Sequence, residues 1–99
     1  MLYAISGTDA PDSLPARLRA RAEHLARIRL LRDEGRLVLA GPYPRLDTSE
    51  PGDAGYSGSL IVAEFDSLAD AESWAGADPY ISAGAWTGIM VKPFVQVLP

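Results

Sequence analysis

The chain contains no cysteine and only one histidine among its 99 residues. The lack of cysteine excludes disulfides, thiol nucleophiles and zinc sites built on thiolate ligands. A single histidine does not supply the ligand set that catalytic metal centres usually need. The glycines at 52, 55 and 58 do not form a phosphate loop either, because no helix starts after them. We therefore expect neither a metal nor a cofactor.

Long apolar runs are also missing, since no segment approaches the roughly 20 residues that cross a bilayer. Residues 1–13 lack the basic start and apolar stretch of a signal peptide. From these two absences we expect a cytoplasmic protein that does not associate with membranes.

Basic residues are outnumbered, with nine Lys and Arg against 13 Asp and Glu and a formal net charge of −4. The arginines lie between Arg17 and Arg45, but Glu23, Asp33 and Glu34 interrupt them. Proteins that bind nucleic acid usually carry a basic excess in one contiguous patch. We interpret the arginine-rich segment as a solvated helix face with ion pairs, and we expect no nucleic-acid partner.

The composition that remains is ordinary for a globular protein, with 47% hydrophobic and 22% charged residues. The length predicts one domain spanning residues 1–99. A chain this short buries only about two thirds of its unfolded surface. Pairing with a second copy would bury more apolar area, which is a first reason to expect a homodimer.

Hydrophobic periodicity and turn residues predict six main elements. Strands are expected at residues 2–6, 36–40, 59–65 and 85–91, and helices at residues 14–34 and from residue 68 onward. Gly41-Pro42 is expected to close the second strand, and residues 43–56 to form a long surface loop. The last strand bends at Lys92-Pro93 and is expected either to stop there or to continue.

Helix boundaries have clear signals. Gly35 suits the left-handed end of the first long helix, Ser67 to Asp70 has the form of a capping box, and Asp78-Pro79 can start a further short helix. The order β-α-β-β-α-β predicts an α+β ferredoxin-like fold, a four-stranded antiparallel sheet with two helices on one face. The other face has no cover within the chain, so a second chain is expected to pack there.

The first long helix carries the most informative pattern. At about 100° per residue, Leu14, Leu18, Leu25 and Ile28 fall on one face, with Leu31 at its edge. His24 lies between Ile28 and Leu31 on this wheel. Arg21 projects onto the same face one turn earlier.

His24 is the first candidate for chemistry, because histidine is the usual residue for proton transfer near neutral pH. The alternative is a core histidine with one satisfied nitrogen. Arg21, if it points toward the sheet, must find an anion, and a substrate carboxylate or phenolate would serve. The alternative for Arg21 is a salt bridge to Glu64 or Asp78.

Asp78 suits a helix cap, because Asp-Pro is a good helix start. One carboxylate can both cap the helix and fix the tautomer of a histidine, but spacing alone does not establish whether Asp78 reaches His24. The hydroxyl of Ser59 could contact a ligand beside the long loop, or be purely structural. Tyr80 could stack on a ligand ring or simply pack in the core.

An ordered set of motifs along nearly the whole chain resembles the YciI-like (YCII-related) family. The set is Arg21-Ala22-Glu23-His24-Leu25, Gly35, Gly41-Pro42, Gly58-Ser59, Asp78-Pro79-Tyr80, Gly84 and Lys92-Pro93-Phe94. The resemblance implies a dimeric ferredoxin-like fold, related to the dimeric α+β barrels. It also implies an active site centred on His24 and Asp78, and substrates among small aromatic, hydroxylated or halogenated compounds.

Three hypotheses about function follow. In the first, the chain is a cofactor-free enzyme that performs elimination, isomerisation or hydrolysis on a small anionic compound. His24 transfers the proton, Asp78 orients it, and Arg21 binds the substrate, together with Ser59 and Tyr80, in a pocket under the long loop. In the second, the same cleft serves a non-catalytic ligand-binding or sensor module. In the third, the dimer surface is the functional element, and the cleft is tightly packed.

Overall fold

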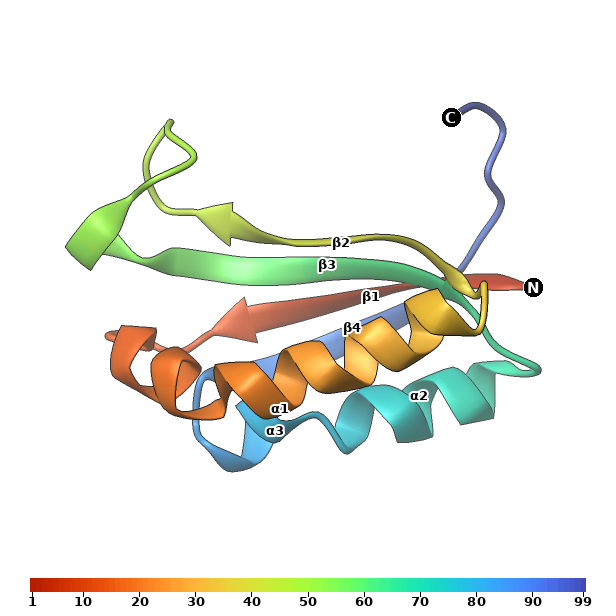
Figure 1. Cartoon of the computed structure of the whole chain (residues 1–99), viewed down its shortest axis with the longest axis horizontal. Coiled ribbons are helices and arrows are strands. Elements are labelled where there is room, and N and C mark those ends of the chain that lie inside the picture. The colour runs from red at the N-terminus through yellow and green to blue at the C-terminus, as the bar shows by residue number, and fades with distance from the viewer.

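A computed structural model describes all 99 residues as one sheet with helices on one side (Figure 1). The elements in chain order are β1 (Leu2–Asp9), α1 (Leu14–Asp33), β2 (Leu37–Pro44), a 3₁₀ turn η1 (Gly52–Ala54), β3 (Tyr56–Glu64), α2 (Leu68–Gly76), α3 (Pro79–Ser82) and β4 (Trp86–Phe94). The strand order is β2-β3-β1-β4, and all neighbouring strands are antiparallel. The predicted ferredoxin-like α+β fold is confirmed.

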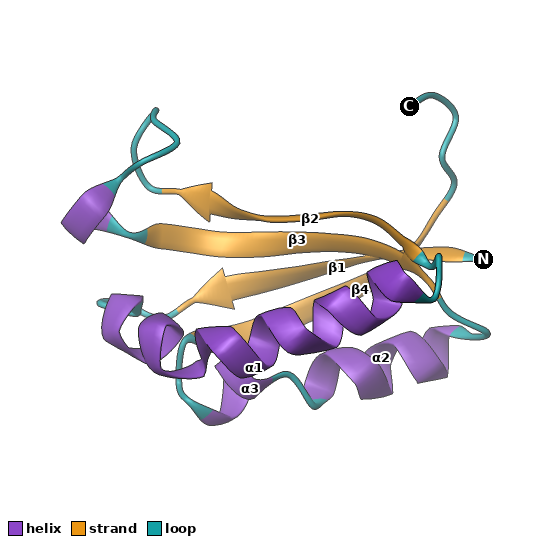
Figure 2. Ribbon diagram, in the orientation of Figure 1, coloured by secondary structure: helices purple, strands orange, loops and turns teal.

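The helices α1, α2 and α3 lie on the same side of the sheet (Figure 2). The central strands β1 and β3 supply the floor of the core, where Ile5 pairs with Ile61 and Tyr3 with Ala63. These four side chains are buried, as expected for the helix-covered face of a strand with a period of two. The core therefore lies between the sheet and the helices.

β2 is longer than predicted, and β4 takes the longer of the two predicted extents, for one physical reason. β2 continues through Gly41-Pro42 to Pro44, and β4 continues through Lys92-Pro93 to Phe94. Proline lacks the N–H that a strand between two neighbours must donate, but an edge strand leaves every second N–H unpaired. Pro42 pairs with Ser59 and Pro93 with Tyr3 without breaking either ladder. The predicted long loop is shortened accordingly, to residues 45–55.

The helix boundaries agree with the sequence signals. α1 ends at Asp33, and Gly35 has φ +74°, the left-handed geometry that glycine adopts without strain. The hydroxyl of Ser67 accepts the Asp70 N–H at 3.1 Å, and Asp78 accepts the Tyr80 N–H at 2.9 Å. Both predicted N-caps are confirmed.

The predicted leucine face of α1 is wrong in part. Leu18 is 62% exposed, whereas Leu31, predicted to lie at the edge of the face, is 2% exposed. The residues that α1 buries are instead Ala16, Arg17, Ala20, His24, Ile28 and Leu31. The reason is that α1 packs mainly against α3 and leaves a cavity between itself and β2, so that Leu18 and Leu25 border the cavity.

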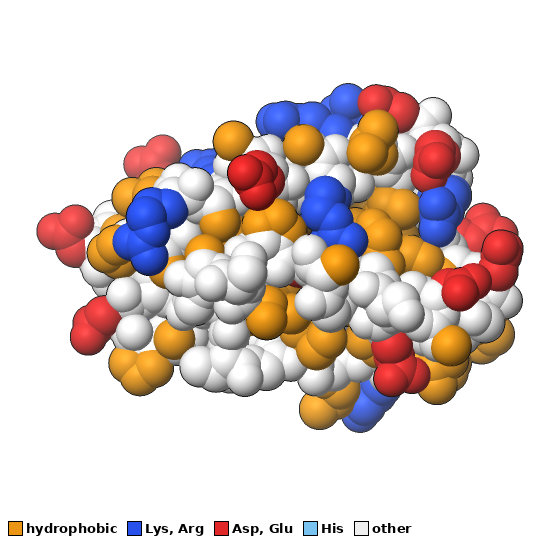
Figure 3. Space-filling model, turned by 90° about the horizontal axis from the view of Figure 1, so that it is seen from below, with side chains coloured by type: hydrophobic (Ala, Val, Ile, Leu, Met, Phe, Trp, Pro, Cys, Tyr) orange, Lys and Arg blue, Asp and Glu red, His pale blue; other side chains and the backbone are white.

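None of the helices is both long enough and apolar enough to cross a membrane. On the face seen in Figure 3, acidic and basic side chains are interspersed among apolar ones. Interspersed charges of both signs fit a solvated surface with local ion pairs.

Candidate active site

His24 and Asp78 form a buried hydrogen-bonded pair. The Nδ1 atom of His24, from the middle of α1, lies 2.9 Å from both carboxylate oxygens of Asp78, the residue that caps α3. The two side chains are 7% and 0% exposed. An ionised carboxylate only accepts hydrogen bonds, so Nδ1 carries the proton and the Nε2 atom of the neutral ring is left as an acceptor.

Aromatic rings hold the His24 imidazole in a fixed orientation. The Tyr80 ring stacks on it with centroids 3.8 Å apart and planes inclined by 10°. The Trp86 ring meets His24 edge-on at 5.5 Å and Tyr80 edge-on at 5.4 Å. With its ring packed on two sides and Nδ1 bonded, His24 has little freedom to change rotamer.

Asp78 has two further partners besides His24. It accepts the Tyr80 backbone N–H, and its second oxygen lies 3.6 Å from an Arg27 nitrogen. Arg27 also donates to the Trp74 carbonyl at 2.7 Å and stacks over the Trp74 ring. Burial lowers the pKa of Arg27, while the Asp78 charge acts in the opposite direction. Asp78 is therefore a helix cap and a histidine partner at once.

Arg17 and Asp9 form a second buried ion pair. The guanidinium donates to the two carboxylate oxygens at 2.6 and 2.7 Å. It also donates to the Ser59 hydroxyl at 2.9 Å and to the Gly58 carbonyl at 3.0 Å. These bonds tie α1 to the ends of β1 and β3, and a bidentate pair of this kind fixes direction as well as distance.

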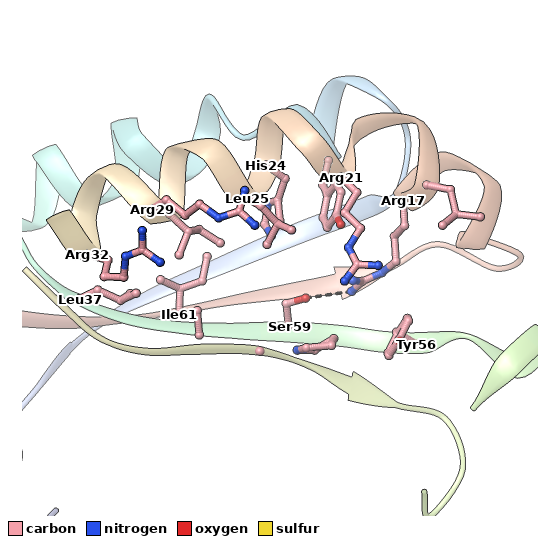
Figure 4. A pocket seen from close by; sticks show the side chains of 16 residues that line it. Arg17, Arg21, His24, Leu25, Arg29, Arg32, Leu37, Tyr56, Ser59 and Ile61 are labelled. Atoms are coloured by element: carbon pink, nitrogen blue, oxygen red, sulfur yellow. Dashed lines mark hydrogen bonds between the residues drawn. The ribbon is translucent and has the colours of Figure 1, made fainter. Parts of the chain in front are cut away.

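Sequence reasoning missed Arg17 and placed Arg21 at the sheet. The signal was present on the helical wheel, because at about 100° per residue Arg17 lies within about 20° of His24, whereas Arg21 is about 60° away. Arg21 is exposed, lines the cavity, and points from α1 toward the sheet beside Arg17 (Figure 4). It forms no salt bridge to Glu64 or Asp78, since the arginine beside Asp78 is Arg27.

The cavity between α1 and strands β2 and β3 has a volume of about 310 Å³ (Figure 4). Four of the five predicted site residues line it: His24, Arg21, Ser59 and Tyr80. Asp78 lies behind His24 and is not part of the wall. Residues 45–55 do not line this cavity, so the expectation of a pocket under the loop is wrong. The cavity instead lies beside residues 37–42 of β2.

The charges around the cavity have one sign. Its lining includes Arg17, Arg21, Arg29 and Arg32 but no aspartate or glutamate. Apolar side chains, among them Ile28, supply much of the remaining wall. A concave site lined by one sign of charge concentrates ions of the opposite sign, so this cavity suits a small anionic ligand.

Tyr80 lines the same cavity. Burial raises the pKa of its phenol, with a further upward effect from Asp78, while the charges of Arg17 and Arg21 lower it. With a raised pKa, the phenol stays protonated at neutral pH and can donate a hydrogen bond. No three His, Cys, Asp or Glu side chains come together as a metal-binding group.

The fold and the site define a small α+β protein with a buried His–Asp pair at a basic cavity. The chain belongs to the YCII-related domain family, whose model matches residues 1–95. It is 54% identical over 97 residues to Protein YciI of Escherichia coli, covering 98% of this chain and 99% of that one. A protein of Haemophilus influenzae is 44% identical over 97 residues, with the same coverage.

A solved structure resembles this chain over nearly its whole length. It is the 5-chloro-2-hydroxyhydroquinone dehydrochlorinase TftG of Burkholderia phenoliruptrix AC1100, in complex with 2,5-dihydroxybenzoquinone. The TM-score is 0.83 at 28% identity, and the match covers 97% of this chain and 95% of the dehydrochlorinase. A member of the same fold therefore binds a small dihydroxylated quinone.

Proposed function

We propose that the chain is a cofactor-free cytoplasmic enzyme in which His24 moves a proton on a small, anionic, hydroxylated aromatic compound. The single observation that carries this proposal is the His24–Asp78 pair, bonded at 2.9 Å beside a basic cavity of about 310 Å³. Asp78 orients the imidazole, and Arg21 holds an anionic oxygen of the substrate. The likeness to the dehydrochlorinase supports the aromatic class of substrate.

The proposed step follows from the position of the proton in the His24–Asp78 pair. With the proton on Nδ1, the lone pair of Nε2 accepts a proton from the substrate and the imidazolium that forms is stabilised by Asp78. In a halogenated hydroxylated ring, moving this proton from a hydroxyl to the carbon that carries the halogen gives a keto tautomer. Loss of a second hydroxyl proton together with the halide then gives a quinone, so that one proton and one halide ion leave in all. The same proton transfer also serves isomerisation or hydrolysis of an unhalogenated compound.

Ser59 and Tyr80 complete the proposed substrate contacts. The Ser59 oxygen accepts from Arg17, which leaves its own O–H to donate toward the cavity. The protonated Tyr80 phenol is a second donor in the same wall. Two neutral donors and one free guanidinium fit oxygen atoms that gain negative charge during the reaction.

Chloride release from 5-chloro-2-hydroxyhydroquinone is the direct test of this function. We expect the protein to accelerate it, and His24→Gln to lower kcat by about 10²–10⁴, the usual worth of a positioned acid–base group. Asp78→Asn should lower kcat without a comparable rise in KM, because it disturbs the tautomer rather than binding. Arg19→Gln, an exposed arginine of α1 outside the cavity wall, is the matched control. Full turnover by the His24→Gln protein would contradict the proposal.

The same variants separate the enzyme from a ligand-binding or sensor module. A sensor would be stabilised by the compound without turning it over, as expected for any ligand that binds only the folded state. It would also tolerate His24→Gln better than Arg21→Gln. The third hypothesis, a pure interaction protein with a tightly packed cleft, disagrees with the cavity of about 310 Å³.

We also propose that two copies pack through the uncovered face of the sheet. Large apolar side chains are exposed on that face, including Leu39 and Tyr43 of β2 and Met90 and Phe94 of β4. Val95, Val97 and Leu98 add to them where the chain leaves β4 and rises away from the helices (Figure 1). Sedimentation should give twice the 10.6 kDa chain mass, and Met90→Glu should shift it toward one chain. A wild-type monomer at micromolar concentration would contradict this.

A further inference from the structure

The cavity holds more unpaired positive charge than one anionic oxygen requires. Arg17 is neutralised by Asp9, but Arg21 and Arg29 form no ion pair with any carboxylate of the chain. Arg32 has only its sequence neighbour Asp33, at 3.1 Å, with both side chains more than 60% exposed. An exposed pair of this kind is worth little and yields readily to a competing anion.

These three arginines are spread along one wall. At a rise of about 1.5 Å per residue, positions 21 and 29 are separated by about 12 Å along the helix axis, and positions 21 and 32 by about 16 Å. Figure 4 shows the Arg29 side chain extending along α1 toward Leu25, and the Arg32 guanidinium above Leu37. The basic groups therefore follow the wall from Arg21 near His24, through Arg29 beside Leu25, to Arg32 above Leu37.

Below this row of basic groups the lining is apolar. Leu25 and Ile28 of α1 face Leu37 of β2 and Ile61 of β3 across the cavity. An apolar floor beside a row of basic groups matches an elongated ligand that has an aromatic body and more than one anionic group. Asp33 lies one turn along α1 from Arg29, but it pairs with Arg32 and leaves Arg29 without an ion pair.

We propose that the substrate is an aromatic acid, and that Arg29 and Arg32 bind its side-chain carboxylate while the reacting ring oxygen lies near Arg21 and His24. This inference rests on the proposed function for the position of the reacting end. Arginine suits the far end because its planar fork can bind a carboxylate through two parallel hydrogen bonds. The second subsite would select acids over neutral phenols of similar size.

Calorimetry with three related probes tests the subsite under anaerobic conditions. The probes are 3-(2,5-dihydroxyphenyl)propanoate, its neutral primary amide, and hydroquinone. We expect the wild-type protein to bind the acid at least about tenfold more tightly than the amide, a difference of about 1.4 kcal/mol. In the Arg29→Gln/Arg32→Gln protein the acid and the amide should bind equally, while the Kd of hydroquinone changes by less than about twofold.

Arg19→Gln removes the same charge from the same helix outside the cavity, and it should keep the preference for the acid. The proposal is overturned if the wild-type protein does not prefer the acid, if the double variant keeps the preference, or if Arg19→Gln abolishes it equally. Turnover of the ring compounds is measured separately from binding. A preference for the acid without turnover of any ring compound removes the proton-transfer function alone, and turnover without that preference removes the acid subsite alone.

Discussion

Two regions that border the same cavity differ in whether their polar side chains are buried and bonded or exposed and unpaired. At the closed end, around His24 and Arg17, each charged group is buried and bonded to a specific partner, Asp78 or Asp9. Along the open side, Arg21 and Arg29 are exposed and have no carboxylate partner. The closed end is organised before any ligand arrives, whereas the open side keeps its charge available for a molecule from solution.

The difference follows from the cost of burying charge. A buried ion must be paired and hydrogen-bonded to be tolerated at all, so the pairs at the closed end are part of the fold. An exposed guanidinium is stabilised by water and can exchange that water for a ligand. Substitutions at the two regions should therefore separate stability from binding.

The largest expected effect is on stability, from Arg17→Ala. It leaves the Asp9 carboxylate buried without its partner, which should lower the free energy of unfolding by about 3–5 kcal/mol. Arg21→Ala, one turn along the same helix, should change it by less than about 0.5 kcal/mol. Urea unfolding of the two variants beside the wild-type protein measures both values. Equal losses would show that the two regions do not differ in this way.

A second pair of variants compares the room for an added Cβ atom at a glycine in each of the two regions. A Cβ atom added to Gly7 would overlap the Trp86 ring, which supports His24, whereas nothing lies within 4 Å of the corresponding position at Gly41. Gly7→Ala should cost about 1–3 kcal/mol through overpacking, and Gly41→Ala, on the cavity wall in β2, much less. Thermal and urea unfolding test this. A stable Gly7→Ala protein would mean that Trp86 can move without loss.

The smallest expected effect appears only in alkali, and it concerns Tyr80. Burial raises its folded-state pKa above the ordinary value of 10.0. A raised folded-state pKa means that the stability contribution is present below the unfolded-state pKa and is lost as the pH rises through the folded-state pKa. The wild-type protein should thus lose more stability above about pH 10 than Tyr80→Phe does. Parallel loss in the two proteins would indicate a phenol that is not effectively buried.

Much of the fold followed from local signals. The helix boundaries were predictable because capping and turn residues act within a few positions, as at Ser67, Asp78 and Gly35. The extents of β2 and β4 were not predictable in this way. Proline is tolerated there only because both strands lie at sheet edges, and edge position depends on the order β2-β3-β1-β4.

The candidate site shows the same division between local and distant information. His24 stood out as the only histidine, on the buried side of a helix. Arg17 shares that side, but the leucine pattern directed attention to Arg21 instead. The partner Asp9 lies in another element, and its distance from Arg17 depends on how β1 and α1 pack.

The sequence by itself determined that this protein forms a ferredoxin-like sheet with helices on one face, and that it has one histidine and no thiol for chemistry. These features depend on periodicity, caps and composition, which are local properties of the chain. Only the tertiary structure decided which residues share the cavity. The His24–Asp78 bond joins residues 54 positions apart, and Arg21 and Arg29 are left unpaired because no acidic side chain folds into the wall. Both facts depend on packing between distant segments, for which a single sequence holds no local signal.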